Sequence, residues 1–406
     1  EGDAFEVNGS LGFQLIQTRS DNINITGTGF VTNANNTVGS ASQTSGGGGV
    51  TDVRQRGYVS QVQLGHLDRR FVQVGLRVDE FSVFGEDVTP AILPKVGGSW
   101  VISDEAFYAG MNRYVNSLRL RAAWGSTGRA PGAGAALTTF NAAPSIAGTI
   151  VESGAVPQNP GNADLNPEKG QEIEFGFDAS FFSERLAVEL TYFDKTTNDL
   201  ILSRPLPPSL GFTQNPQVNI GEVRNSGLEL TLSATPYENS FLTWDVRGGF
   251  ATLKNRLVDL GDVSPFGTTN RFTEGYQLGS FVSKKIRNIN ETTGVVTVAD
   301  TLEVVGGAFP TLEGTLTNTV TLWNQLRVSA QIDTKRGHLV FNNTAFFRET
   351  QLVRSDDRLN VNKLPALERL RRYGNPTAGQ PAFVQENGSP TTVNEVREAF
   401  MQPGDF

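Results

Sequence analysis

The chain has 406 residues, a net charge of −8 and no cysteine, and 38% of its residues are hydrophobic against 19% charged. The missing cysteines exclude disulfide staples, thiolate metal sites and cysteine nucleophiles, and an acidic chain without a basic cluster does not suit a nucleic-acid partner. No apolar run approaches the roughly 18 to 20 residues that a membrane-spanning helix needs.

The chain opens at Glu1 without a basic or apolar leader, so we expect a secretory signal to be absent, removed already or outside this sequence. The first long polar connection is predicted at 32–50 and contains four consecutive glycines at 46–49. No helical pattern follows these glycines, which favours a flexible loop tip over a phosphate cradle.

Further along the chain, apolar residues recur at every second position. In 171–182, for example, Ile173, Phe175 and Phe177 point to one side of an extended chain, whereas Glu172 and Glu174 point to the other. We expect about a dozen such strands of roughly 9 to 14 residues, which is the length of a tilted membrane strand. Clear examples lie at 72–78, 118–124, 173–181, 186–192, 228–232, 242–250, 316–322 and 326–332.

The connections between these segments alternate in length. Loops beyond about 15 residues are uncommon in compact domains unless they are functional. Their alternation with short turns places all the long loops at one end of the sheet, as in outer-membrane barrels with periplasmic turns and extracellular loops. The short connections are 67–70, 182–186, 235–241 and 323–326, and the long ones are 32–50, 126–169, 200–220, 255–311 and 340–404.

A soluble β-sandwich or β-helix would also alternate. The length of the segments, the asymmetry of the two ends and the mixture of charges on the polar side favour a membrane barrel instead. Aromatic residues near segment ends suit either interfacial girdles or ordinary packing. They are Phe84, Trp100, Trp124, Tyr192, Tyr237, Trp244 and Trp323.

Three runs carry a family resemblance. LRLRAAWGSTGRAP at 118–131, LNPEKGQEIEFGFDASFFSERLAVELTYFDKTTNDLIL at 165–202 and NIGEVRNSGLELTL at 219–232 resemble the C-terminal barrel region of SusC/RagA-type TonB-dependent outer-membrane receptors. With neighbouring blocks, the resemblance covers about 50–345. It implies an all-β fold, an antiparallel transmembrane β-barrel that is part of a barrel of about 22 strands.

The resemblance also implies an N-terminal plug domain and a TonB box, and no segment of 1–406 resembles either. We therefore interpret 1–406 as barrel region from a larger receptor. Gly404–Phe406 resembles the start of the family's next block; alternatively, Phe406 is a C-terminal aromatic of a smaller, closed barrel. In the third run, Asn225 and Gly227 suit a bulge or a close approach of strands.

Catalytic patterns are missing from the sequence. His66 and His338 have no second histidine or cysteine beside them for metal ligation, and no nucleophile elbow, P-loop or zinc-protease motif occurs. Glu172 and Glu174 share a face and are interpreted as lumen lining rather than a glycosidase pair. The acidic loop residues do not follow EF-hand spacing, which leaves a looser calcium site open. We predict no enzyme activity, cofactor or metal site.

The resemblance implies a bacterial outer-membrane receptor that takes up a glycan, oligosaccharide or peptide. Its partners would be outer-membrane lipid, a SusD-like lipoprotein and TonB. Within the long loops, residues with stacking faces or donors are the ligand-binding candidates. They are Phe212, Phe266, Arg271, Phe272 and Tyr276.

Two alternatives remain at this point. The first is a non-transporting outer-membrane surface protein that serves adhesion or assembly. The second is a secreted β-rich enzyme, which would require a convergent acid/base or metal cluster that the sequence does not display.

Overall fold

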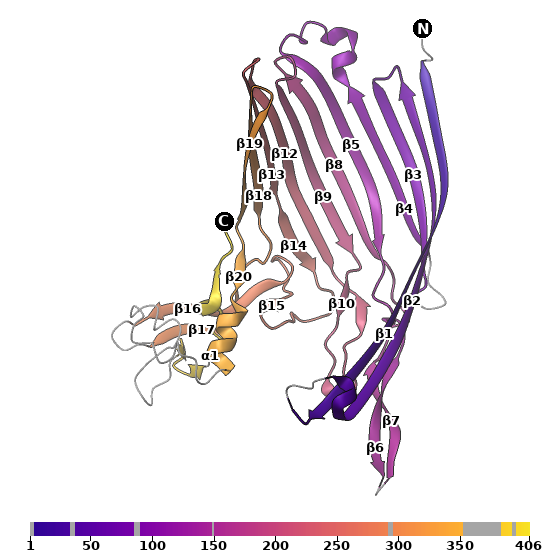
Figure 1. Cartoon of the computed structure of the whole chain (residues 1–406), viewed down its shortest axis with the longest axis vertical. Helices are drawn as coiled ribbons and strands as arrows, with labels where there is room; N and C mark the ends of the chain where they lie inside the picture. Colours follow the sequence, from indigo (N-terminus) through magenta and orange to yellow (C-terminus); the bar gives the residue numbers. More distant parts are fainter. Residues whose placement is uncertain are drawn as a thin grey trace.

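One large antiparallel sheet dominates the computed structural model, which describes residues 4–32, 37–84, 90–147, 150–290, 295–351, 383–391 and 395–406 (Figure 1). The sheet has 12 strands in the order β1-β2-β3-β4-β5-β8-β9-β12-β13-β18-β19, with β14 paired to β12 off this path. The strands are β1 (Phe5–Phe30), β2 (Ala41–His66), β3 (Arg70–Phe81), β4 (Ala91–Val101), β5 (Val115–Arg129), β8 (Glu168–Phe181), β9 (Leu186–Asn198), β12 (Glu222–Glu238), β13 (Leu242–Thr252), β14 (Lys254–Asp259), β18 (Leu312–Leu322) and β19 (Leu326–Arg336).

The two ends of the sheet differ. At the turn end, uppermost in Figure 1, short connections join β2 to β3, β8 to β9, β12 to β13 and β18 to β19, as the sequence predicted. A longer connection, 102–114, joins β4 to β5 there and contains two 3-10 turns, Ile102–Asp104 and Ala106–Tyr108. At the loop end, all other connections emerge. Neighbouring strands thus run up and down the sheet in turn.

Three of the four tight turns contain left-handed residues, Phe182 to Glu184 among them, and two of these turns consist of a pair of such residues. Leu67 and Asp68 have φ of 54° and 55°, and Trp323 and Asn324 have φ of 51° and 53°. Two successive left-handed residues define a type I′ turn, whose twist matches that of the strands it joins. A bulky residue such as Trp323 is strained in this conformation. Its ring packs edge-on against Phe241 at 5.0 Å, which offsets part of that cost.

Strands β1 and β2 depart from the predicted length. Each has 26 residues, and β2 pairs with β3 only over Gln55–His66. Its first part, 41–54, pairs with β1 alone, so the hairpin extends past the rest of the sheet. The predicted loop 32–50 is therefore wrong for 41–50: the glycines at 46–49 lie in β2. Glycine has low strand propensity, but the β1 ladder supplies hydrogen bonds that override it.

The other long connections contain secondary structure of their own, which the sequence did not predict. Parts of 32–50, 126–169, 255–311 and 340–404 lie outside the described residues. Around the loop end, small sheets form between β6 and β7, β10 and β11, β20 and β23, and within a five-stranded set of β15, β16, β17, β21 and β22. These elements are β6 (Thr139–Ala147), β7 (Ile150–Asn159), β10 (Ile201–Ser203), β11 (Gln217–Asn219), β15 (Asn270–Arg271), β16 (Ser280–Ile289), β17 (Val296–Gly306), β20 (Leu339–Phe341), α1 (Asn343–Gln351), β21 (Phe383–Gln385), β22 (Pro390–Thr391) and β23 (Met401–Pro403), with 3-10 turns at Val38–Ser40, Pro208–Leu210 and Arg397–Phe400.

The hydrophobic core lies at the loop end rather than between layers of sheet. Three buried clusters are found in the described residues, and each joins connections that are distant in the sequence. Phe84 belongs to one of them, with an exposed fraction of 8%. The girdle role considered for Phe84 is therefore wrong, because its ring packs under the loops. The clusters are Val83, Phe84, Ala135 and Leu165; Leu200, Val223, Leu257 and Leu260; and Val296, Val298, Phe383 and Val396.

At Gly227 the predicted close approach of strands is confirmed. Along one edge of β12, the hydrogen-bonded partner strand changes near Gly227 from β14 to β13. A Cβ at Gly227 would lie 1.9 Å from the carbonyl oxygen of Thr252 and 2.9 Å from the ring of Phe193. Only glycine therefore fits where the chain passes from β13 to β14.

Helices contribute little to the structure. In the part of the chain that is described, no helix is both long and apolar enough to cross a membrane.

Candidate functional site

One face of the large sheet is apolar and exposed. Residues paired across the ladders share a face, so Leu120, Phe177 and Leu190 stand in one row. Within the described part of the chain, no second layer of protein covers this face, and the exposed fraction of Leu11 reaches 88%. Soluble proteins rarely expose an apolar surface of this extent. Exposed large residues of this face are Phe5, Val7, Leu11, Phe13, Leu15, Tyr58, Val62, Leu64, Val72, Val74, Leu76, Ile92, Val96, Trp100, Leu120, Ile173, Phe175, Tyr192, Leu228, Trp244, Phe250, Leu316, Leu326, Val328 and Ile332.

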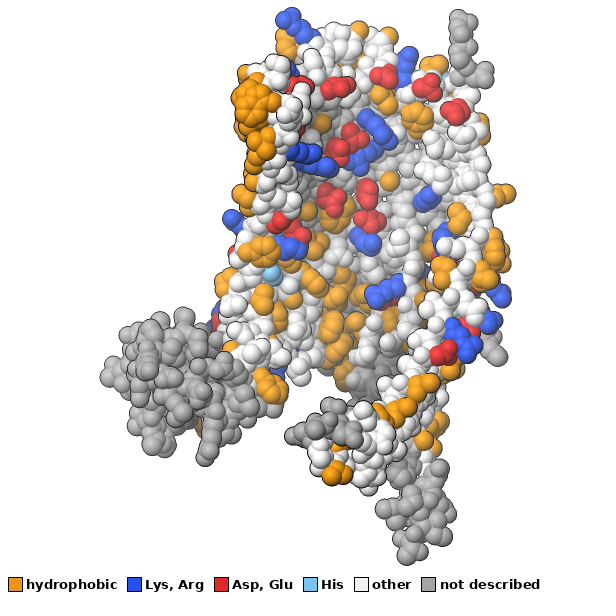
Figure 2. All heavy atoms as spheres, viewed as in Figure 1, with side chains coloured by type: hydrophobic (Ala, Val, Ile, Leu, Met, Phe, Trp, Pro, Cys, Tyr) orange, Lys and Arg blue, Asp and Glu red, His pale blue; other side chains and the backbone are white. Residues whose placement is uncertain are grey.

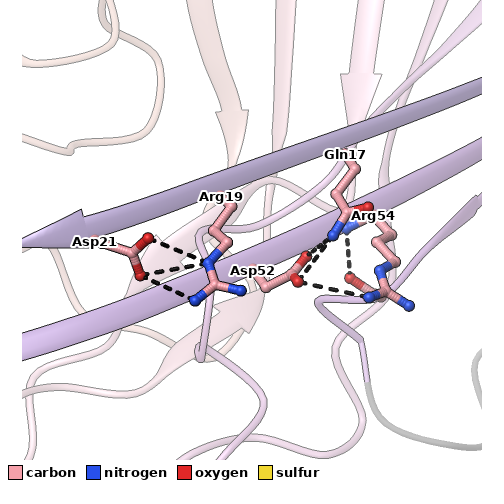
Figure 3. A network of polar contacts seen from close by, with 6 residues as sticks. Gln17, Arg19, Asp21, Asp52 and Arg54 are labelled. Carbon is pink, nitrogen blue, oxygen red and sulfur yellow. Dashed lines mark hydrogen bonds and ion pairs between the residues drawn. The ribbon is translucent and has the colours of Figure 1, made fainter.

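The apolar face is limited toward the loop end by polar residues. On the β1–β2 hairpin, Gln17, Arg19 and Asp21 follow Leu15 on the same side of β1. Figure 3 shows Gln17 donating to Asp52, which also pairs with Arg54 at 3.5 Å, while Arg19 pairs with Asp21 at 3.2 Å. These groups require water or lipid headgroups rather than hydrocarbon.

A second ion pair marks the same limit across the sheet. Asp194 follows Tyr192 on the apolar side of β9, and Arg224 on β12 donates to it through Nε at 2.9 Å. On β1, the apolar stretch from Phe5 to Leu15 covers roughly 33 Å of extended chain. At the tilt of about 40° usual for membrane strands, this gives a band about 25 Å tall, the height of the apolar band of outer-membrane barrels.

The opposite face is hollowed and charged. Figure 2 shows acidic and basic side chains gathered over its upper and middle parts. Opposite charges meet there at short range: Arg121 and Asp178 at 2.9 Å, and Lys195 and Glu172 at 3.2 Å. Charged residues of this face include Arg77, Lys95, Arg119, Arg121, Glu172, Glu174, Asp178, Glu189, Lys195, Glu229, Arg247, Glu313, Arg327, Asp333 and Lys335.

Basic side chains cross neighbouring strands on this face by lying over glycines. Arg121 passes over Gly176 on β8 and donates to the Thr191 hydroxyl on β9 at 2.8 Å. Lys95 likewise passes over Gly75 on β3 and donates to Gln61 on β2 at 2.9 Å.

Arg77 crosses Gly57 in the same way to reach Gln14 at 3.0 Å. Because each glycine lacks a side chain, one long cation can bond to the second strand beyond its own. The charged wall is therefore tied together across its strands.

A hollow of about 500 Å³ lies on the charged face toward the turn end. Polar groups of Gln63, Gln73 and Glu174 and the cations Arg119 and Arg121 line it. Glu174 is thus part of a wall facing the interior of the sheet's curve. This agrees with the interpretation of Glu172 and Glu174 as lining residues.

The connection 102–114 is anchored to the turn end by Glu105. Its carboxylate accepts from Trp100 Nε1 at 2.9 Å and from Arg70 at 2.6 Å. The Trp100 hydrogen bond is the largest influence that lowers the pKa of Glu105 below its ordinary value of 4.5, and Arg70 adds to it while desolvation opposes it. Arg69 also pairs with Glu105, at 3.6 Å. The turn end therefore carries two ion pairs of Glu105 beside the aromatic rings of Trp100 and Phe107, which lie 6.3 Å apart.

Four of the five predicted ligand residues come together at the loop end. Phe266 and Phe272 stack with centroids 4.8 Å apart and pack against the buried cluster around Leu257. Arg271 donates to the carbonyl of Pro265 at 3.0 Å. Tyr276 has a half-exposed side chain, and its carbonyl accepts from the N–H of Leu257. In this arrangement, the two phenylalanine rings pack the loop.

Phe212, the fifth candidate, lies in the connection from β9 to β12, beyond Leu210 of a 3-10 turn. A cavity of about 390 Å³ is lined by neighbours of Phe212, including Thr213 and Gln214, together with Asn159. Phe212 was named from the sequence, but none of the residues that line this cavity was. The repeated triplet Gln-Asn-Pro, at 158–160 and 214–216, was the available signal.

Each of the two histidines lies near a side chain that is distant in the sequence. The His66 ring lies 4.6 Å from that of Phe5, and His338 Nδ1 lies 4.0 Å from an Asp405 carboxylate oxygen. Among the described residues, no group of three or more His, Cys, Asp or Glu side chains is placed to hold a metal ion.

An antiparallel sheet with one exposed apolar face, one charged concave face, tight turns at one end and elaborate loops at the other defines the wall of an outer-membrane type of β-barrel. Residues 2–337 match the family described as TonB dependent receptor-like, beta-barrel. The chain belongs to this family, and the matched range takes in the whole large sheet. Proteins of this family are outer-membrane barrels that act as transporters, not enzymes.

Similar proteins agree with this assignment. The chain is 32% identical over 222 residues to TonB-dependent receptor P39 of Formosa agariphila, covering 54% of this chain and 21% of that protein. It is 26% identical over 217 residues to TonB-dependent receptor SusC of Bacteroides thetaiotaomicron, covering 52% and 21%. The matched part of the chain covers about a fifth of the length of these curated relatives.

Among solved structures, the RagAB peptide importer in the closed-closed state superposes with a TM-score of 0.76 at 20% identity, over 100% of this chain and 46% of that one. At this identity the likeness concerns the fold. The resemblance to SusC/RagA-type receptors and the all-β antiparallel barrel class are thereby confirmed, while the count of about 22 strands stays a prediction.

Proposed function

We propose that this chain forms part of the barrel wall of a bacterial outer-membrane receptor. The receptor imports a nutrient of the glycan, oligosaccharide or peptide class. The observation that supports this most directly is the division of the sheet into an exposed apolar face and a charged concave face. Lipid solvates the first, and the second lines the interior. In this orientation the turn end lies in the periplasm and the loop end outside the cell.

The proposed partners are a SusD-like lipoprotein at the loop end and TonB as the source of energy. The similarity to SusC and to the RagAB importer supports this part of the proposal. A plug domain supplied by another part of the receptor would lie against the charged face. The loop candidates Phe212, Phe266, Arg271, Phe272 and Tyr276 stay proposals for ligand contact. Tyr276 presents the most accessible ring for stacking, since half of its side chain is exposed.

Cysteine labelling tests the topology, because the chain has no cysteine of its own. In the full-length receptor on intact cells, a membrane-impermeant maleimide should label Leu210→Cys at the loop end and leave Arg113→Cys at the turn end unlabelled. After the outer membrane is permeabilised, both should react. Labelling of Arg113→Cys alone on intact cells would contradict the proposed orientation.

Uptake measurements test transport itself. Cells that carry the full-length receptor should accumulate a radiolabelled nutrient, and a protonophore should abolish the accumulation because TonB uses inner-membrane energy. If the protein reaches the surface in the proposed orientation but deletion of its gene changes no uptake, the adhesion or assembly alternative is favoured instead.

A further inference from the structure

Two loop segments of identical sequence lie side by side at the loop end. Gln158 and Asn159 are the last residues of β7 and Pro160 follows them, and Gln214–Asn215–Pro216 directly precedes β11. The backbone N–H of Gln214 donates to the carbonyl oxygen of Gln158 at 2.8 Å. The two connections, β5 to β8 and β9 to β12, are thus joined where their sequences repeat.

Both asparagines fix the loops that surround them. Asn159 Nδ2 donates to the carbonyl oxygens of Gly134 and Leu137, both at 3.3 Å. Asn215 Oδ1 accepts from the N–H of Leu206 at 3.1 Å. Hydrogen bonds from side-chain amides to the backbone fix the conformation of a loop that has no regular secondary structure.

The cavity of about 390 Å³ lies between these segments and 132–135, and we call it the amide cavity. Its volume falls within the range of about 300–1,000 Å³ that small-molecule sites occupy. No Lys, Arg, Asp or Glu is among the described residues that line it. The side chains that do so with amides or hydroxyls are Asn159, Ser203, Thr213, Gln214, Asn215 and Gln217.

One residue that lines the amide cavity carries a buried acceptor without a partner. Gln217 Oε1 is buried and has no hydrogen-bond partner within the described structure, although Asn162 Nδ2 donates to the backbone carbonyl of the same residue at 3.0 Å. Buried polar atoms without partners are rare and costly, and they often mark a place where a ligand or water supplies the missing bond.

The floor of the cavity allows close approach. A Cβ added to Gly132 or to Gly134 would meet no atom within 4 Å, so open space lies over the backbone there. Gly134 has φ of +76°, a conformation that other residues rarely adopt. A ligand can therefore approach this stretch of backbone closely.

We propose that the amide cavity binds a neutral sugar unit of the imported ligand. Amides and hydroxyls supply both donors and acceptors, which matches a ring bearing several hydroxyls. Charged ligands, including peptides with ionised termini or side chains, would enter without a counter-charge and lose their hydration. This inference deepens the proposed function and rests on it for the exposure of the loop end to the medium.

Calorimetry on the purified full-length receptor in detergent tests the inference without any need for transport. The probes are neutral hexasaccharides of glucose, mannose and xylose, an oligogalacturonate of the same length and a hexapeptide. At least one neutral hexasaccharide should bind, and Gln217→Ala and Gln214→Ala should each weaken its binding at least tenfold. Gln325→Ala, at the turn end, is the matched control and should bind as the unchanged receptor does.

Heat-modifiable mobility on gels checks that each variant retains its barrel. Gln214 is exposed, so its truncation keeps the test valid even if Gln217→Ala fails to fold. The inference is overturned if no neutral hexasaccharide binds, if only the oligogalacturonate or the peptide binds, or if binding is insensitive to both substitutions. Sugar binding without energised uptake would instead count against the proposed function and leave the amide cavity assignment standing.

Discussion

The guanidinium group of Arg121 lies over Gly176, so close that a Cβ on the glycine would sit 3.2 Å from the Arg121 Cζ and 2.6 Å from the Leu190 carbonyl oxygen. The absence of a side chain at this one position lets the cation reach both Asp178 and Thr191. The stability of the charged wall thus depends on where glycines stand as much as on where charges stand.

Gly176→Ala should therefore destabilise the barrel by about 1–3 kcal/mol, the usual cost of overpacking. The nearest atom belongs to the backbone of β9, which cannot move aside alone. Urea unfolding of the full-length receptor in lipid vesicles measures this. The matched control is Gly249→Ala on β13, where a Cβ meets nothing within 4 Å; it should be neutral or slightly stabilising. Equal effects of the two substitutions would show that the crossing of Gly176 has no energetic importance.

Substitutions on the two faces of β3 should differ in their effect on stability. Val74→Arg places a charge on the side that we assign to lipid, near the middle of the band, and should destabilise the folded receptor by about 2–4 kcal/mol. Gln73→Arg, one residue earlier, points to the charged face and should cost little. Unfolding in lipid vesicles compares the two. If the penalties are the same or reversed, the assignment of the two faces is wrong.

The five-stranded set at the loop end should loosen in acid. Lys284 Nζ contacts Glu395 at 2.8 Å, and the hydrogen bond from Lys284, followed by that from Thr391, lowers the pKa of Glu395 below its ordinary value of 4.5. A lowered pKa means that the contact contributes its full stability above pH 4.5 and loses it as the pH falls from there through the lowered value.

Hydrogen exchange measures this loss directly, because the N–H of Lys284 donates to the carbonyl of Glu395 at 2.9 Å. After correction for intrinsic rates, protection of β16 amides should decrease below pH 4.5. In the Glu395→Gln variant, the protection of β16 amides should already be lower at neutral pH. It should no longer decrease as the pH falls below 4.5, because the titrating carboxylate is absent. An unchanged pH profile in that variant would assign the loss to other carboxylates.

Truncation of Phe272 separates packing from ligand contact at the loop end. Phe272→Ala removes the ring stacked on Phe266. It should cost roughly 2–3 kcal/mol of local stability, somewhat less than the 3–5 kcal/mol of a fully buried phenylalanine. Limited proteolysis should then cleave 260–280 faster. Tyr276→Ala, whose ring is half exposed, should leave the cleavage rate unchanged. If Phe272→Ala impairs nutrient binding without faster cleavage, its ring contacts the ligand.

The sequence alone predicted eight of the twelve strands of the large sheet and which of their side chains share a face. Alternation at every second position, as in 171–182, fixes which side chains share a face, because the extended backbone permits no other arrangement. The turns at 67–70 and 323–326 were equally visible. The long strand β2 was missed at 46–49, since local glycine propensity says nothing of a partner strand.

Tertiary structure decided what no local pattern encodes. The ring of Phe84 is near the end of a strand in the sequence, yet it lies in a cluster built from other loops. The two Gln-Asn-Pro triplets are 56 residues apart in the sequence and meet only because β8 and β9 run up and down between them. Long loops take their shape from contacts with one another. Such contacts form between segments far apart in the sequence, and a local sequence pattern does not determine which segments meet.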